Sequence, residues 1–312
     1  MSQKNTMQAF APGDVFAAAT LLNDPKDDHA GPGRIIQYDA DLNEKGVLWT
    51  EGTTHLVGGT TFGPDGNLWA FDSNEHTVVR VSPDGKQLPE IEFAERSFSN
   101  CNFMPDGTVV MGEHLVGNES RFPLGTTLSK VPGEDLFGYG HVYRFTLDGE
   151  LVKEYETESH GGMTGFLGIT TSSLAPDGKT LVYSSETGPR VFRYDLEADQ
   201  QLPDLVTFTP ESRHMVLVAR HRPDGSLLMI KAVSREDFVL NHLDADGEVQ
   251  QEWTLPGPGW AVVNNSLDDN VVLLGNFFTG TVAKFDLGSG EIVAQADVGV
   301  QRSLAGLVQY AG

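Results

Sequence analysis

Histidine and arginine side chains recur at one place relative to a repeated turn. His55 and His214 each precede an aspartate–glycine turn by ten residues, and Arg96 stands at the same distance before another. Trp260 and Arg302 fall near the same register further along the chain. Imidazole exchanges protons near neutral pH and guanidinium holds anions, so this pattern indicates acid–base or anion-binding chemistry at one end of a repeating structure.

A second set of polar residues ends the apolar run that follows each turn. Lys231 ends the run SLLMIKA, where a lysine withdrawn from water would act as a base or an anion anchor. Equivalent positions in other repeats supply candidate substrate contacts, which are Asp72, His114 and Glu186.

The two histidines have a third candidate partner. His160 lies in the glycine-rich stretch SHGGMTGF ahead of another repeat. Three converging imidazoles, from His55, His160 and His214, would suit a divalent metal such as zinc. The same histidines would equally serve as general acid and base without a metal. The sequence leaves both possibilities open, and one zinc or calcium ion is the only cofactor that we consider.

The elements that position these residues form a repeat. The turn Pro-Asp-Gly lies between two apolar runs at Asp65, Asp106, Asp177 and Asp224, and a degenerate version follows at Asp268. Asp-Gly between apolar runs favours a β-hairpin, since both residues tolerate a positive φ. A second hairpin turn follows in each repeat. Two hairpins in a period of roughly 42 residues make four antiparallel strands, the pattern of a β-propeller blade.

Five such units extend from about residue 54 to residue 299. The preceding segment supplies three more strands, DVFAAAT, RIIQYDAD and GVLWTEG, and the C-terminal SLAGLVQYAG supplies a fourth. We therefore predict an all-β protein, a six-bladed β-propeller with four antiparallel strands per blade, in one domain over residues 1–312. Pairing of the N- and C-terminal segments in one blade would close the ring. His55 and His214 would then face each other across the channel.

One repeat carries an insertion at about residues 115–140, between its two hairpin turns. The insertion follows the second strand of its blade, at the same end as the candidate site. Its aromatic residues Phe122, Phe137 and Tyr139 argue against a disordered excursion. We expect the insertion to form a lid or wall over the channel mouth.

Composition limits the partners. The 44 Asp and Glu against 21 Lys and Arg give a formal charge of −23, which repels phosphate backbones and anionic lipid surfaces. We therefore expect a small-molecule substrate and no nucleic-acid or membrane partner. The single cysteine, Cys101, cannot form an intrachain disulfide, and the N-terminus lacks a basic start followed by an apolar run. Both observations favour a cytoplasmic protein, whose oligomeric state the sequence leaves open.

Two stretches carry a resemblance to a known family. LAPDGKTLVYSSETGPRVFRYDLEAD (174–199) and FGPDGNLWAFDSNEHTVVRVSPDGK (62–86) resemble the blade signature of the senescence-marker-protein, gluconolactonase and luciferin-regenerating-enzyme family. The second stretch is also similar to NHL-repeat propellers. The resemblance implies a six-bladed propeller with an active site at the channel mouth. It also implies hydrolysis of lactones or phosphoesters with a Ca²⁺ ion held by one Glu, two Asn and one Asp.

The calcium ligands of that family map onto mostly unsuitable residues. The matching positions are Gly58, Ser99, Thr170 and Leu217. Asn100, next to Ser99, would supply one amide ligand, whereas Ca²⁺ takes about six to eight oxygen ligands. The resemblance therefore implies the fold more strongly than the calcium-dependent reaction.

Lyases of the streptogramin and peptidylglycine-amidating types are related propellers that work at the same mouth with histidine and other polar residues. We predict a lyase-type enzyme that cleaves a cyclic or aromatic oxygenated small molecule by acid–base chemistry, with or without a metal. The alternatives are a lactone or ester hydrolase and a non-catalytic binding propeller. The predicted catalytic residues are His55, His214, Lys231 and Arg96. The predicted substrate-binding residues are Arg302, Trp260, Asn100, His114, Glu186 and Asp72.

Overall fold

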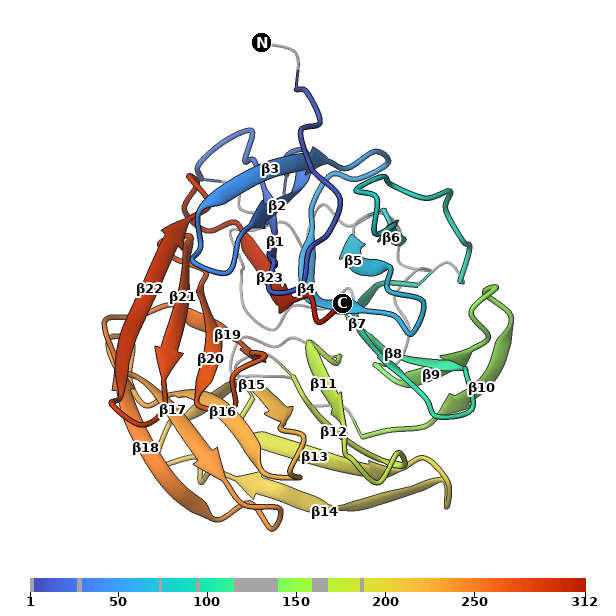
Figure 1. Ribbon diagram of the computed structural model, residues 1–312. Helices are drawn as coiled ribbons and strands as arrows, with labels where there is room; N and C mark the ends of the chain where they lie inside the picture. Colours follow the sequence, from blue (N-terminus) through green and yellow to red (C-terminus); the bar gives the residue numbers. More distant parts are fainter. Residues whose placement is uncertain are drawn as a thin grey trace. The chain divides into compact units, whose positions relative to one another are not determined.

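The strands of this chain form six antiparallel sheets (Figure 1). The computed structural model describes residues 3–26, 30–72, 75–93, 96–114, 140–158, 168–185 and 188–312. The chain is all-β and folds as a six-bladed β-propeller, as the turn spacing predicts. No helix in the described ranges is long and apolar enough to cross a membrane. The chain divides into two compact units, a first unit of Met1–Ile91 with Ala261–Gly312 and a second unit of Glu92–Trp260.

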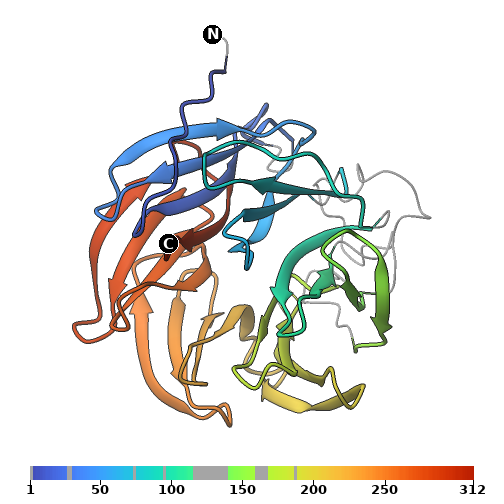
Figure 2. The same cartoon turned by 45° about the vertical axis from the view of Figure 1, so that its right-hand side comes forward.

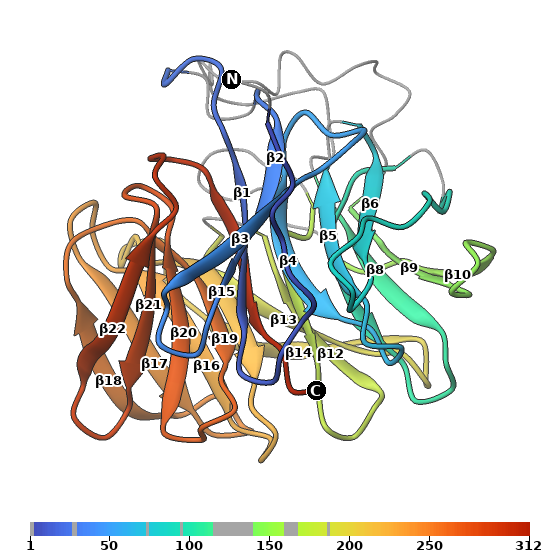
Figure 3. The ribbon, with the colours of Figure 1, turned by 45° about the horizontal axis from the view of Figure 1, so that its top comes forward.

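One blade of the first unit joins the two ends of the chain. Its strand order is β23-β1-β2-β3, and the last strand of the chain pairs antiparallel with the first (Figures 1 and 3). Its strands are β1 (Val15–Thr20), β2 (Gly33–Tyr38), β3 (Glu44–Trp49) and β23 (Leu304–Gln309). The predicted pairing of the N- and C-terminal segments in one blade is therefore confirmed.

The residues before β1 form a strap on the outside of this blade. This segment, dark blue in Figure 2, crosses the outer strand β3. Thr6 N and Met7 N both donate to Val47 O, at 2.8 and 3.1 Å. Phe10 then packs against Phe16, with ring centroids 4.4 Å apart. The strap thereby covers the edge of a strand that would otherwise present unpaired backbone groups.

Two further blades belong mainly to the first unit. One consists of β4 (Val57–Phe62), β5 (Leu68–Asp72) and β6 (Thr77–Val81). The other consists of β19 (Trp260–Asn265), β20 (Val271–Asn276), β21 (Thr281–Asp286) and β22 (Glu291–Asp297).

The β4–β6 blade has three assigned strands where four were predicted. The segment after β6 begins to pair, since Val81 forms an antiparallel bridge with Gln87 and Leu88 N donates to Arg80 O at 2.8 Å. Pro89 follows and has no backbone N–H to donate to the ladder. Its carbonyl accepts a hydrogen bond from Arg80 Nη2 at 2.7 Å. A side chain thus replaces the backbone pairing of the fourth strand.

The second unit holds three four-stranded blades. The first consists of β7 (Phe98–Phe103), β8 (Val109–Glu113), β9 (Val142–Phe145) and β10 (Leu151–Tyr155). The next consists of β11 (Thr171–Leu174), β12 (Thr180–Ser184), β13 (Arg190–Asp195) and β14 (Gln200–Thr207). The last consists of β15 (Met215–His221), β16 (Leu227–Ala232), β17 (Phe238–Leu243) and β18 (Val249–Leu255). Within this unit, β11 lies between β7 and β15 (Figure 1).

The Pro-Asp-Gly turns are longer than two-residue hairpin turns. Gly107 N donates to Met104 O and Gly225 N donates to Arg222 O, each at 3.0 Å, and both glycines have a positive φ. The preceding Asp224 does not share that φ, because proline and aspartate occupy the centre of an ordinary turn that the glycine ends. The hairpins are as predicted, but only the glycine needs the left-handed conformation.

Hydrophobic cores lie between neighbouring blades in each unit. In the first unit, Phe16 and Ile35 pack with Leu68 of the β4–β6 blade, and all three are fully buried. In the second unit, Val110 packs with Leu181 of the next blade. Burial between blades, rather than in one central core, allows a chain of this length to fold as repeated units.

Candidate functional site

His55 is a buried residue where three strand ends of the first unit meet. Its Nδ1 lies 3.4 Å from the hydroxyl of Thr20 at the end of β1. Its backbone N–H donates to Asp72 Oδ2, at the end of β5, at 2.7 Å. Thr20 and Asp72 are both almost completely buried. The loop before β4 therefore holds the imidazole in a fixed polar setting.

Asp72 holds two loops of the first unit together. Its Oδ2 accepts from Thr54 N at 2.6 Å as well as from His55 N, and its Oδ1 accepts from Glu75 N at 3.1 Å. These bonds occupy much of the hydrogen-bonding capacity of the carboxylate. The substrate contact predicted for Asp72 stays a prediction, whereas its structural role is visible.

The same position repeats in two other blades as an anchor for the loop that follows it. Glu113 Oε2, at the end of β8, accepts from Gly140 N at 2.8 Å. Asn276 Oδ1, at the end of β20, accepts from Thr279 N at 3.0 Å. In these three blades, the polar residue at the end of the second strand thus satisfies backbone donors of the next connection. A repeated acceptor at this register was the sequence signal for this role.

Arg96 lies in the second unit and is already paired. Its Nη1 donates to Glu113 Oε1 at 2.8 Å, and its guanidinium lies 4.8 Å from the centre of the Tyr143 ring. His114 follows Glu113, is buried, and donates from its backbone N to Ser97 O at 2.7 Å. Arg96 and His114 therefore lie on adjacent segments, and His114 is the last described residue before the insertion. The predicted lid, at about 115–140, lies outside the described residues except for Gly140.

His214 stands in a titratable cluster of the second unit. Its half-buried ring packs edge-to-face on Phe208, with centroids 5.3 Å apart. Lys231 Nζ lies 5.8 Å from the centre of the same Phe208 ring and pairs with Glu252 Oε2 at 3.0 Å. Glu252 also accepts from Asn241 Nδ2 at 2.9 Å, and these hydrogen bonds, from Asn241 and then Lys231, lower the pKa of its carboxyl. Imidazole, ammonium and carboxylate thus share one face of the β15–β18 blade.

Both polar atoms of the Asn100 side-chain amide form hydrogen bonds within the second unit. Its Nδ2 donates to Ser99 Oγ at 2.8 Å, and its Oδ1 accepts from the hydroxyl of Ser172 on β11. The side chain therefore ties β7 to β11. This arrangement leaves the amide less free to bind a metal or a substrate than the sequence pattern implies.

Two other predicted residues lie at the start of β19 and in the loop before β23. Trp260 is almost fully buried, and its Nε1 donates to Pro256 O at 3.1 Å within the turn before β19. Arg302 is half-buried, has a φ of 56°, and donates from its backbone N to Phe277 O at 2.8 Å. His160 and Glu186 lie outside the described residues. The predicted opposition of His55 and His214 stays a prediction.

The described ranges contain no group of three or more His, Cys, Asp or Glu that could hold a metal ion. His160, the third member of the predicted metal set, is outside those ranges. The metal site therefore stays a prediction.

Comparisons with known proteins bear on the fold. No family model and no curated protein match the chain. The solved nidogen/laminin complex matches with a TM-score of 0.64 and 11% identity over 95% of this chain and 97% of that one. Virginiamycin B lyase from Staphylococcus aureus matches with a TM-score of 0.54 and 13% identity over 93% and 90%. A catalytically inactive histidine-to-alanine variant of that lyase with quinupristin matches with 0.55 and 12% over 99% and 96%.

These likenesses agree with the propeller fold of the chain. At 11–13% identity they establish the architecture alone. The fold implied by the resemblance to the gluconolactonase family is confirmed, and membership of that family is not.

Proposed function

We propose that this chain is an enzyme that cleaves a small oxygenated molecule by lyase-type chemistry, with His214 as the proton carrier. The observation that carries the proposal is the cluster of His214, Lys231 and Glu252 on one face of the β15–β18 blade. It combines an imidazole, a common general acid–base group, with a cation and an anion that pair with each other.

The roles follow from the chemistry of each group. In an elimination, a base removes a proton from the carbon next to a C–O bond. The electron pair forms a double bond as the C–O bond breaks, and the departing oxygen receives a proton. Neutral His214 is suited to the first step. The Lys231 ammonium, held by Glu252, is suited to stabilise the departing oxygen.

The neighbouring lyase supports the reaction class. Its histidine-to-alanine variant is catalytically inactive, so one histidine is indispensable on that propeller. This chain has half-buried His214 at a junction between a loop and a first strand, and His55 at the equivalent junction of another repeat.

The test compares His214→Ala with a matched control, His242→Ala. His242 lies on β17 of the same blade, where its Nε2 is 2.9 Å from Ser226 Oγ. Purified variants are incubated with a panel of cyclic esters and aromatic oxygenated compounds in water enriched in heavy oxygen, and products are read by mass spectrometry. We expect His214→Ala to lower kcat by about 100-fold or more at an unchanged Tm, because general acid–base groups contribute about that much. His242→Ala should keep near-normal turnover.

The outcomes separate the alternatives. Equal activity of the His214→Ala variant and the natural protein would remove His214 from the mechanism. Heavy oxygen in the product of the natural protein would identify a hydrolase, because an elimination incorporates no water. Absence of turnover across the panel would favour the non-catalytic binding propeller.

A further inference from the structure

Arg220 differs from two arginines of the second unit that pair with carboxylates. Arg96 pairs with Glu113 and Arg190 pairs with Asp204. No carboxylate pairs with Arg220 in the part of the chain that the structure describes, and its Nε has neither exposed surface nor a hydrogen-bond partner. The residue as a whole is half-buried, and burial of this one N–H without an acceptor is unfavourable.

The three inner strands of the second unit, here called the inner wall, place no acidic residue beside Arg220. Arg220 is the sixth residue of β15, and the inner strands β7, β11 and β15 read FSNCNF, TSSL and MVLVARH. None of these three strands has an acidic residue, although the chain has 44 Asp and Glu. Arg220 interacts electrostatically with the adjacent His221 and with the buried Cys101 thiol of β7, and burial raises the pKa of that thiol. Cys101 is therefore neutral at physiological pH.

The neutral polar groups of the wall are fixed by bonds between its strands. Asn102 of β7 donates to Ser172 Oγ of β11 at 2.8 Å and accepts from Leu174 N at 2.9 Å. His221 N of β15 donates to Ser173 Oγ at 2.9 Å. These bonds hold the three strands in place beside Arg220. The Arg220 guanidinium therefore lies on an inner wall whose side-chain amides and hydroxyls mostly form hydrogen bonds to one another.

We propose that Arg220 binds the carboxylate of a small molecule at this inner wall of the second unit. The planar guanidinium can donate two parallel hydrogen bonds to a carboxylate, and an anion would neutralise the uncompensated charge. The inference goes beyond the proposed function. Arg220 lies six residues after His214, about 20 Å along an extended strand, so the carboxylate site is separate from the His214 cluster. Arg96 and Lys231 pair with the chain's own carboxylates, which leaves Arg220 as the candidate anion anchor.

The test uses benzoate as the probe and benzamide as its neutral counterpart. Calorimetric titration and thermal unfolding are measured on the natural protein, Arg220→Met and Arg220→Lys. We expect benzoate to bind and to raise the Tm of the natural protein, and benzamide to do neither. Arg220→Met should weaken benzoate binding at least about tenfold, and Arg220→Lys should bind with intermediate affinity because it keeps the charge without the planar fork.

A second readout does not depend on ligand. Methionine has a similar length and no charge, so Arg220→Met should raise the Tm of the ligand-free protein, by about 2 °C, if the guanidinium is uncompensated. A lower Tm for this variant would show that Arg220 has a structural partner and would overturn the inference. Equal benzoate affinity in the natural protein and Arg220→Met would also overturn it, as would a response to inorganic phosphate alone.

The two proposals fail separately. His214→Ala should retain benzoate binding, because His214 is assigned to chemistry and not to the anion. If benzoate affinity is equal in the natural protein and Arg220→Met while turnover requires His214, the carboxylate assignment is wrong and the proposed function stands. If benzoate binds at Arg220 while His214→Ala turns over substrate normally, the reverse holds.

Discussion

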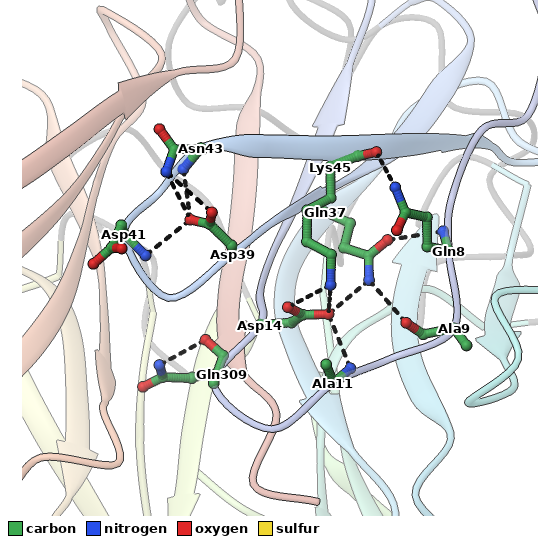
Figure 4. A network of polar contacts seen from close by, with 11 residues as sticks. Gln8, Ala9, Ala11, Asp14, Gln37, Asp39, Asp41, Asn43, Lys45 and Gln309 are labelled. Carbon is green, nitrogen blue, oxygen red and sulfur yellow. Dashed lines mark hydrogen bonds and ion pairs between the residues drawn. The ribbon is translucent and has the colours of Figure 1, made fainter.

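Asp14 is a buried carboxylate at the start of β1 that several donors hold in place (Figure 4). Its Oδ2 accepts from Ala11 N at 2.9 Å and from Gln37 Nε2 at 2.7 Å. Lys45 Nζ lies 2.8 and 2.7 Å from its two oxygens. The Lys45 side chain is 22% exposed and that of Asp14 only 4%, so the carboxylate depends on this ammonium for its charge balance.

Removing the Lys45 ammonium should therefore leave the buried Asp14 carboxylate unpaired and destabilise the fold. We expect Lys45→Met to lower the free energy of unfolding by about 3 kcal/mol, measured by urea denaturation, because it leaves a buried charge unpaired. Adding Asp14→Asn should recover part of the loss. The control is Lys86→Met, whose partner Asp84 is exposed and whose loss should change stability little. A loss in Lys45→Met no larger than in the control would contradict this account.

Single residues were the hardest part of the site to predict. Lys231 was expected to need a partner, but Glu252 lies two strands away and is brought to it by the β16–β17–β18 register. Arg220 gave no signal, since it and His221 are two polar residues at the end of an apolar run, next to a hairpin turn. The pattern of the inner strands becomes informative only when β7, β11 and β15 are known to adjoin.

At the scale of elements, the Pro-Asp-Gly turns were predictable because each is a local motif. Their aspartates also bond to the residue two positions on. Asp106 accepts from the Thr108 hydroxyl and Asp224 from the Ser226 hydroxyl, both at 2.6 Å. These bonds lower the pKa of both carboxyls. The sequence predicted a fourth strand in the β4–β6 blade, which the structure does not have. The residues around Pro89 favour a strand, but Pro89 itself cannot donate a backbone hydrogen bond.

The turn aspartates predict how stability depends on pH. A carboxyl whose folded pKa is depressed stabilises the fold above its unfolded pKa of about 3.9, and that contribution disappears as the pH falls through the folded pKa. The free energy of unfolding should therefore drop below about pH 4. Asp224→Asn should show a shallower drop than the natural protein when urea denaturation is compared at pH 6 and pH 3. An identical slope in both would show that this turn does not contribute.

At the scale of the whole molecule, charge is distributed unevenly. The chain carries a formal charge of −23, yet β7, β11 and β15 contain no acidic residue. The sequence predicted a local basic site within an acidic protein. That contrast stays a prediction, since Arg96 and Lys231 pair with Glu113 and Glu252. Composition and turn spacing were enough for the number of blades. They did not locate the unpaired cation, because pairing depends on which side chains meet in three dimensions.

The net charge also predicts a response to salt. At neutral pH the excess carboxylates repel one another, and folding brings them closer together. Salt screens this repulsion over a Debye length of about 10 Å at 0.1 M. The Tm at pH 7 should therefore rise as KCl is increased from low to physiological concentration, whereas near the sequence pI of about 4.6 it should change little. Differential scanning calorimetry at both pH values measures this. A Tm that falls with salt at pH 7 would mean that attractive pairs such as Asp14–Lys45 and Arg190–Asp204 outweigh the repulsion.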